Sequence, residues 1–287
     1  MGLIERFRRN APEERDLDDP GNIRRALWLE QFDVHFQPIV DVESGSLAGV
    51  EALVRWEHPD VGVIPAHRFV PIAERAGLLL PLDVDTLRTA SEFRRDLSVD
   101  ADQLRVTLNL AASELMRPEL VDTLEKILDQ TGLPTDHLEV ELAEEALQAD
   151  PDVIAATVRR IHQAGISISI DDFGSNEDLL KLLQKLPVDR VKIDLSSVPV
   201  QLSADPTDEE IAELARARET AEAAIERAVV SAQSWGVGVG AKRVESIEHL
   251  QLLRAMDITR AQGFVLGRPV SQAEFGQHDA DALEETA

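Results

Sequence analysis

The sequence contains no cysteine and no tyrosine, and only 4% of its 287 residues are aromatic. The absence of cysteine excludes disulfide bonds and metal sites built on thiolates. Basic residues are also scarce, since 29 lysines and arginines stand against 54 aspartates and glutamates, for a formal net charge of -25. Binding along a nucleic-acid polymer or an anionic membrane needs a basic surface, so the charge argues against both. A local basic pocket for a small anionic ligand remains compatible with it.

Long hydrophobic runs are missing as well. No uninterrupted apolar stretch approaches the ~20 residues that span a bilayer, so we expect no transmembrane segment. The first fifteen residues are charged and lack the apolar centre of a secretory signal. These observations predict a cytoplasmic protein. The 44% of hydrophobic residues is sufficient for a sizeable core.

The order of the predicted elements favours a closed barrel. Residues 34–40 and 47–56 read as an antiparallel hairpin around a short turn at Gly45. Helical and strand patterns then alternate, with about eight strands in all and no linker rich in proline, glycine or serine, which favours one α/β barrel. The further predicted strands are 104–108, 138–142, 166–170, 188–193, 236–241 and 258–263, and the predicted helices are 21–31, 66–76, 84–97, 118–130, 151–164, 176–185, 207–235 and 246–254.

Polar side chains follow the predicted strands at the point where each strand ends. Asp171 and Asp172 come directly after an apolar run, and two adjacent carboxylates in such a place usually need a cation. Because parallel strands of a barrel end at the same mouth, the polar groups after the other strands should meet this pair. Those groups are Glu51, Asn109, Glu141 and Lys192.

The chemistry of this set predicts a hard-cation site. Carboxylate and amide oxygens suit Mg²⁺ or Mn²⁺, and Asp172 could extend the site to a second ion. Two such ions about 3.5–4 Å apart can generate hydroxide and stabilise phosphodiester cleavage. Lys192 would position the attacking water or neutralise phosphate charge.

Seven motifs make the chain resemble the EAL domains, the cyclic di-GMP phosphodiesterase family. The resemblance extends from residue 34 to residue 269. Its motifs are Phe36-Gln37-Pro38-Ile39-Val40, Glu51-Ala52-Leu53-Val54-Arg55-Trp56, Leu108-Asn109-Leu110, Glu139-Val140-Glu141-Leu142, Asp171-Asp172-Phe173-Gly174, Lys192-Ile193-Asp194 with the preceding Leu186-Pro187-Val188-Asp189, and Gln262-Gly263-Phe264.

The resemblance implies an α/β fold, a modified TIM (β/α)8 barrel with one antiparallel strand. We expect the EAL domain at 23–275, and the composition of the ends predicts a flexible leader at 1–22 and an acidic disordered tail at 276–287. By position the resemblance implies a first metal site at Glu51, Asn109, Glu141 and Asp171, a second at Asp172, catalytic roles for Glu51, Lys192 and Gln262, and contacts with cyclic di-GMP (c-di-GMP) from Gln37, Arg55 and Asp194. Two of these have plainer alternatives, since Arg55 could pair with a surface acid and Asp194 could cap a loop.

One departure from the family pattern decides the functional prediction. Lys242 stands where the family has a glutamate that helps to hold the second metal. The exchange changes the local charge by two units, and at ~4 Å from a divalent ion this amounts to a repulsion of several kcal/mol even at an effective dielectric near 20. The ammonium could instead occupy the place of the second cation. The loop after Asp172 also departs, with Asn176 in place of a glycine.

We therefore expect a degenerate EAL domain that binds c-di-GMP in signalling and has little or no hydrolase activity. One Mg²⁺ or Mn²⁺ is expected, at the first site only. Two alternatives stay open, an active phosphodiesterase that produces linear pGpG and a nucleotide-independent protein scaffold. We also expect an unidentified protein partner, and homodimer formation stays open.

Overall fold

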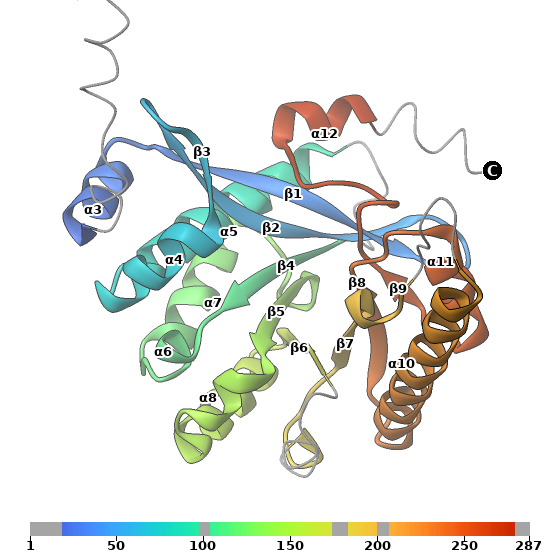
Figure 1. The fold of residues 1–287 in the computed structure, drawn as a ribbon. Helices are drawn as coiled ribbons and strands as arrows, with labels where there is room; N and C mark the ends of the chain where they lie inside the picture. The colour runs from blue at the N-terminus through green and yellow to red at the C-terminus, as the bar shows by residue number, and fades with distance from the viewer. Residues whose placement is uncertain (1–18, 98–103, 174–182, 200–206, 279–287) are drawn as a thin grey trace, which may run out of the picture.

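The computed structural model describes residues 19–97, 104–173, 183–199 and 207–278, and its main feature is a closed barrel of eight strands (Figure 1). β1 runs antiparallel to both of its barrel neighbours, β2 and β9, and the other barrel neighbours are parallel. The prediction of a TIM barrel with one antiparallel strand is confirmed. The barrel strands are β1 (Phe32–Asp41), β2 (Leu47–His58), β4 (Arg105–Leu110), β5 (Leu138–Ala143), β6 (Ser167–Asp171), β7 (Arg190–Asp194), β8 (Gly238–Lys242) and β9 (Arg260–Ala261).

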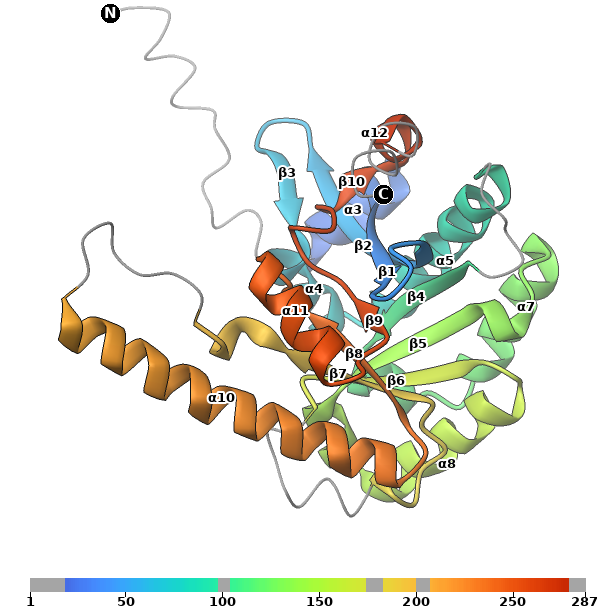
Figure 2. The ribbon, with the colours of Figure 1, turned by 90° about the vertical axis from the view of Figure 1, so that its right-hand side faces the viewer.

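Helices cover the outside of the barrel, and one of them extends beyond it. This helix, α10, crosses the side of the barrel near β7 and β8 and then projects past it (Figure 2). The other helices are α3 (Pro20–Trp28), α4 (Ala66–Arg75), α5 (Leu79–Asp96), α6 (Ala112–Leu115), α7 (Leu120–Thr131), α8 (Pro151–Gln163), α10 itself (Asp208–Ser234), α11 (Ile247–Ala255) and α12 (Gln272–His278), with 3-10 turns η2 (Thr135–His137), η3 (Glu144–Gln148) and η4 (Leu195–Ser197).

Local sequence signals explain where these helices begin and end. Thr207 and Glu210 form a capping box at the start of α10. Asp150 caps α8, whose first residue is proline, the residue best suited to that position. Gly132 ends α7 with a φ of 73°, a left-handed conformation that glycine adopts without a Cβ penalty.

Apolar side chains fill the layer between the barrel and the helices. Fully buried examples are Val106, Leu108, Val140 and Ile168 on the strands, and they pack against buried residues of the surrounding helices. A second, smaller core lies under α3 and α4 around Trp56. The helical layer thus supplies most of the apolar burial, while the polar residues of β4, β5, β7 and β9 face the lumen, as their contacts below establish.

The structure corrects several element boundaries. α5 begins at Leu79, five residues before the predicted start, because Pro81 lies in the first turn, where a missing N–H costs little. The edge strands β3 (Gly62–Pro65) and β10 (Val270–Ser271), and helices α6 and α12, were not predicted. Most of the helix predicted at 176–185, most of the leader and most of the tail lie outside the described residues. Among the helices that the structure describes, none is both long and apolar enough to cross a membrane.

Candidate functional site

Glu51 lies at the centre of a hydrogen-bonded group at the mouth of the barrel. Its Oε1 accepts a hydrogen bond of 2.7 Å from Asn109 Nδ2, and its Oε2 accepts one of 2.6 Å from Gln262 Nε2. Gln262 Nε2 also donates to Gln37 Oε1 at 3.0 Å, and Gln37 Nε2 donates to the carbonyl of Gly267 at 3.0 Å. The structure therefore brings together four predicted site residues from β1, β2, β4 and the segment after β9, and both carboxylate oxygens of Glu51 are already oriented.

A second group is the buried ion pair of Lys192 on β7 and Glu141 on β5. Their side chains are only 5% and 3% exposed, and Lys192 Nζ donates to Glu141 Oε2. Burial raises the pKa of Glu141, and Glu51 and Asp171 add to the rise, against the opposing effect of Lys192. Burial alone would lower the pKa of Lys192, but the carboxylates of Glu141, Glu51 and Glu139 together raise it. Lys192 therefore stays a cation at neutral pH.

Lys242, at the end of β8, neutralises the adjacent acid pair. Its Nζ lies 2.7 Å from Asp171 Oδ2, 2.7 Å from Asp172 Oδ1 and 3.9 Å from Asp194 Oδ2. Burial opposes the charge of Lys242, yet hydrogen bonds to Asp171 and Asp172 raise its pKa above the usual range. Burial also raises the pKa of Asp171, and Lys242 limits that rise. The cation that two neighbouring carboxylates need is thus supplied by the chain itself.

Arg243 adds a second cation at the same edge, one that the sequence analysis did not select. Its Nε lies 3.2 Å from Asp194 Oδ2, while Asp194 Oδ1 accepts a hydrogen bond of 2.7 Å from Ser196 N. Asp194 therefore caps η4, as one alternative predicted. Arg243 has a φ of 57° and Asp172 a φ of 56°, and both lie in the left-handed region that residues other than glycine rarely adopt. The sequence signal for Arg243 was its position directly after Lys242, at the end of the predicted strand 236–241.

The predicted ligand-contacting residue Arg55 lies on β2, on the same strand as Glu51. Its Nη1 donates to the carbonyl of Val54 at 2.9 Å. Burial lowers its pKa, and the nearby charge of Glu51 opposes this effect. The half-buried guanidinium is therefore close enough to the Glu51 group to meet a ligand there, and no surface acid pairs with it within the described part of the chain.

The donor set fits one divalent ion. Glu51, Asn109, Glu141 and Asp171 offer the oxygen ligands that Mg²⁺ or Mn²⁺ prefers, and Glu141 interacts electrostatically with both Glu51 and Asp171. Asp171 Oδ1 is buried and has no hydrogen-bond partner among the described residues, so it is available as a ligand. A divalent ion held there would supply positive charge against a phosphate group. As the side chains lie, no three acidic or histidine residues of the described ranges already form a metal cluster.

The donor set does not fit a second ion. Such an ion would have to use Asp172, and Asp172 holds the ammonium of Lys242. The oxygen of Asp171 that faces Asp172 across this ammonium is occupied in the same way. A cation therefore already fills the place between the two carboxylates.

Comparison with known proteins identifies the fold and its family. The EAL domain family model matches residues 21–269. Two curated relatives from Pseudomonas aeruginosa are the cyclic di-GMP phosphodiesterase NbdA, 34% identical over 92% of this chain and 32% of the relative, and the bifunctional diguanylate cyclase/cyclic di-GMP phosphodiesterase MucR, 32% identical over 91% of this chain and 36% of the relative. The chain thus spans about a third of the length of these relatives.

Solved structures give the same result. The PaMucR phosphodiesterase in complex with c-di-GMP superposes with a TM-score of 0.77 at 29% identity, over 89% of this chain and 98% of that one. The EAL domain of FimX from Pseudomonas aeruginosa, bound to c-di-GMP, has a TM-score of 0.73 at 22% identity over 87% of this chain and 95% of that one, a likeness of fold alone. With a family model that matches most of its length, the chain belongs to the EAL domain family.

Proposed function

We propose that this chain is a degenerate EAL domain, which binds c-di-GMP as a signalling module and hydrolyses it little or not at all. The observation that carries the proposal is the ammonium of Lys242 held between Asp171 and Asp172 at 2.7 Å from each. These are charge-assisted hydrogen bonds, the strong kind. A second divalent ion would have to displace this cation, so hydrolysis that needs two ions should fail.

The energetics favour the internal cation. A lysine that leaves the pair loses two short contacts, and its raised pKa means that it leaves as a charged group. A divalent ion ~4 Å from that charge meets a repulsion of several kcal/mol at an effective dielectric near 20. At the first metal position Lys192 holds Glu141 Oε2 and Lys242 holds Asp171 Oδ2, but Asp171 Oδ1 has no hydrogen-bond partner among the described residues and stays available to an ion.

Retention of the ligand-contacting set supports nucleotide binding. Gln37 and Gln262 are buried and hydrogen-bonded beside Glu51. Arg55 carries a planar guanidinium that can hold a phosphate through two hydrogen bonds. Among the relatives, the PaMucR phosphodiesterase was solved with c-di-GMP. A protein partner that reads the bound state, and homodimer formation, remain predictions from the sequence.

The decisive experiment measures binding and turnover in the same samples. The full chain is titrated with c-di-GMP by calorimetry, with Mg²⁺, with Mn²⁺ and with EDTA, and each sample is then analysed for linear pGpG. We expect binding without product, and weaker binding for Arg55→Ala. The MucR phosphodiesterase domain serves as the active control. Turnover comparable with that control would overturn the proposal that the enzyme has lost its activity. The absence of any c-di-GMP binding would favour the protein scaffold instead.

Lys242→Glu and Lys242→Met separate the effects of charge and ligand. Both substitutions remove the ammonium, but only the first restores a carboxylate ligand. We expect Mn²⁺-dependent binding of a second ion to Lys242→Glu alone. Turnover need not follow, because the loop after Asp172 also departs from the family pattern.

A further inference from the structure

Three arginines gather at the base of the barrel, at the opposite end from the mouth. Arg105, Arg190 and Arg260 are the first residues of β4, β7 and β9. These strands are linked through parallel neighbours, so their first residues lie at the same end of the barrel. Arg190 and Arg260 are followed two positions later by the mouth residues Lys192 and Gln262, which share their side of the strand because side chains alternate. We call the three the base arginines.

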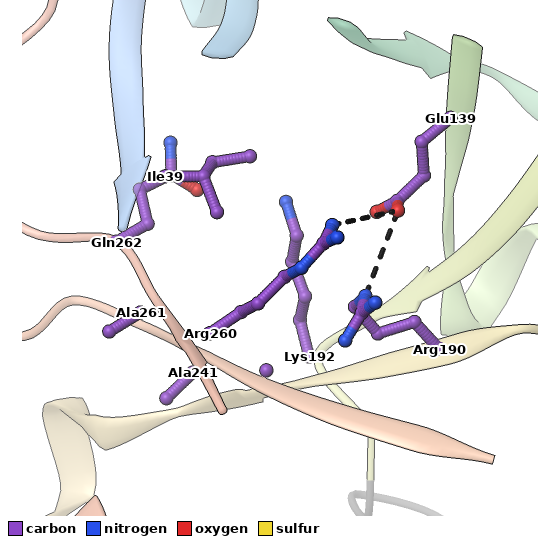
Figure 3. Close-up of a pocket in the computed structure, with 9 residues that line it drawn as sticks. Ile39, Glu139, Arg190, Lys192, Ala241, Arg260, Ala261 and Gln262 are labelled. Carbon is purple, nitrogen blue, oxygen red and sulfur yellow. Dashed lines mark ion pairs between the residues drawn. The ribbon is translucent and has the colours of Figure 1, made fainter. Parts of the chain in front are cut away.

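Two of the base arginines, Arg190 and Arg260, face a single buried carboxylate, that of Glu139, which is 2% exposed. Arg190 Nε and Arg260 Nη1 each lie 3.7 Å from Glu139 Oε2, and both guanidinium groups point toward it from different strands (Figure 3). These separations are too long for hydrogen bonds. Within the described residues, Arg190 Nε and Glu139 Oε2 are buried and have no hydrogen-bond partner. The pairs attract each other, but they leave donors unused.

Positive charge exceeds negative charge in this cluster. Burial, together with repulsion from Arg190 and Arg105, lowers the pKa of Arg260 to about 10, while Glu139 and Asp41 oppose the shift. Asp41 is bound mainly by Ser44, whose backbone and hydroxyl groups lower the pKa of that carboxyl. Arg105 donates to Ser167 at 2.7 Å, a neutral partner. In a chain of net charge -25, three arginines thus meet only two carboxylates here, those of Glu139 and Asp41.

The neighbouring strand leaves room for the guanidinium of Arg190. β8 carries Gly238 and Gly240 beside the base arginines, and a Cβ on Gly238 would lie 3.2 Å from Arg190 Nη1, closer than an ordinary van der Waals contact. The side chains of Arg190 and Arg260 are 15% and 19% exposed, so solvent reaches them. The cavity that the two guanidinium groups line has a volume of about 10 Å³, the size of one water molecule. Anything larger must bind at the exposed side of the guanidinium groups.

We propose that the base arginines bind a small inorganic oxyanion, with phosphate as the simplest example. The guanidinium fork matches phosphate oxygens through paired, charge-assisted hydrogen bonds. The anion binds Arg190 and Arg260 from the solvent side, with Arg105 contributing charge, and a water in the small cavity links Arg190 to Glu139. Such a ligand fixes the starts of β7 and β9, the strands that lead to Lys192 and Gln262.

The test is the thermal unfolding of the full chain in phosphate and in sodium chloride of equal ionic strength. A ligand at about a hundred times its Kd raises the unfolding temperature of a domain of this size by roughly 5–10 °C. We expect this rise for the wild type and its loss in Arg190→Gln/Arg260→Gln. The matched control is Arg88→Gln/Arg95→Gln, which removes two exposed arginines of α5 and should keep the rise. General salting effects act equally on both variants.

Two further variants make the result decisive. Gly238→Ala keeps every charge but places a methyl group against Arg190, so it should weaken phosphate binding about tenfold in calorimetry, and it decides the question if the double variant does not fold. Arg55→Ala, at the mouth, should keep the full rise. The same rise in Gly238→Ala or in the base double variant would overturn the proposal, as would its loss in Arg55→Ala, which would place the phosphate at the mouth.

Discussion

The mouth and the base of the barrel carry opposite excesses of charge, and their ion pairs differ in length. At the mouth an excess of carboxylates is matched by internal cations, and Lys242 lies 2.7 Å from both Asp171 and Asp172. At the base an excess of cations faces one carboxylate, and both ion pairs of Glu139 are 3.7 Å long. The place of a second metal ion at the mouth is therefore filled by Lys242, whereas the base has donors to spare. Two carboxylates that already hold a cation resist an added one, and arginines with unused donors favour an added anion.

The largest expected effect comes from breaking the tight ion pair beneath the mouth. Lys192→Met leaves Glu141 buried without its cation, and removal of one partner of a buried pair costs about 3–5 kcal/mol. Arg260→Met at the base should reduce the free energy of unfolding much less, by about 1 kcal/mol. The contact of Arg260 with Glu139 is long, and the substitution removes the repulsion between Arg260 and Arg190. Urea unfolding of both variants measures the difference.

The control for this comparison is the double variant Lys192→Met/Glu141→Gln. It removes both charges, so most of the stability lost in Lys192→Met should return. If Arg260→Met proves as damaging as Lys192→Met, the two ends of the barrel do not differ in the way that their ion-pair lengths indicate.

A second pair of neighbouring carboxyl groups, besides Asp171 and Asp172, extends the comparison. Asp83 on α5 and Glu114 on α6 interact directly, and Glu114 Oε1 is buried without a hydrogen-bond partner among the described residues. Burial, followed by repulsion from Glu114, raises the pKa of Asp83 well above 3.8. Burial also raises the pKa of Glu114, although Asp83, Ala111 N and Arg117 oppose the rise and Glu74 adds to it.

The sign of the resulting pH dependence follows from linkage. A carboxyl group with a raised pKa holds its proton more tightly in the folded state, so stability falls as pH rises above the ordinary carboxyl range. Asp83→Asn removes one of the two charges and should stabilise the protein by about 1 kcal/mol at pH 8, with no gain near pH 4. The exposed Asp85→Asn on the same helix is the matched control and should show no such gain. Unfolding in urea at both pH values measures it, and equal gains at both would remove titration as the cause.

The sequence predicted the mouth better than the base. The carboxyl end of a parallel strand is fixed by the strand pattern alone, so the residues after each apolar run, such as Glu51, Asn109 and Glu141, could be assigned to one mouth. The resemblance to the EAL domains, not the strand pattern, indicated that Lys242 could take the place of a cation between Asp171 and Asp172. The structure has the predicted hairpin, with β1 and β2 paired from Phe32↔Trp56 to Val40↔Leu47.

What escaped prediction depends on register and on distant contacts. Arg190, Arg260 and Glu139 converge only because three strands begin at matching heights, which no local motif encodes. Asp83 and Glu114 belong to two helices separated by a strand and a loop, and each looks like an ordinary surface acid in its own segment. The short strands β3 and β10 have too few residues for a period to be recognised.

The smallest expected effect concerns the outermost cation at the mouth. Arg243 has a φ of 57°, and its contact with Asp194 involves a side chain that is 59% exposed. The left-handed backbone costs about 1 kcal/mol for a side chain other than glycine, whereas an exposed ion pair contributes about 0.2–1 kcal/mol. Arg243→Gly should therefore be slightly more stable than the wild type, by up to about 0.5 kcal/mol, although glycine also gains entropy in the unfolded chain. Arg243→Ala loses the same ion pair without relief of the backbone and should be less stable than the wild type. Urea unfolding of both variants separates the cost of the left-handed backbone from the contribution of the ion pair.

The same two variants also test metal binding. Because Lys242 alone holds both Asp171 and Asp172, neither variant should gain binding of a second metal ion. Binding of a second metal ion by Arg243→Gly would show that Lys242 and Arg243 together, rather than Lys242 alone, exclude this ion from the mouth.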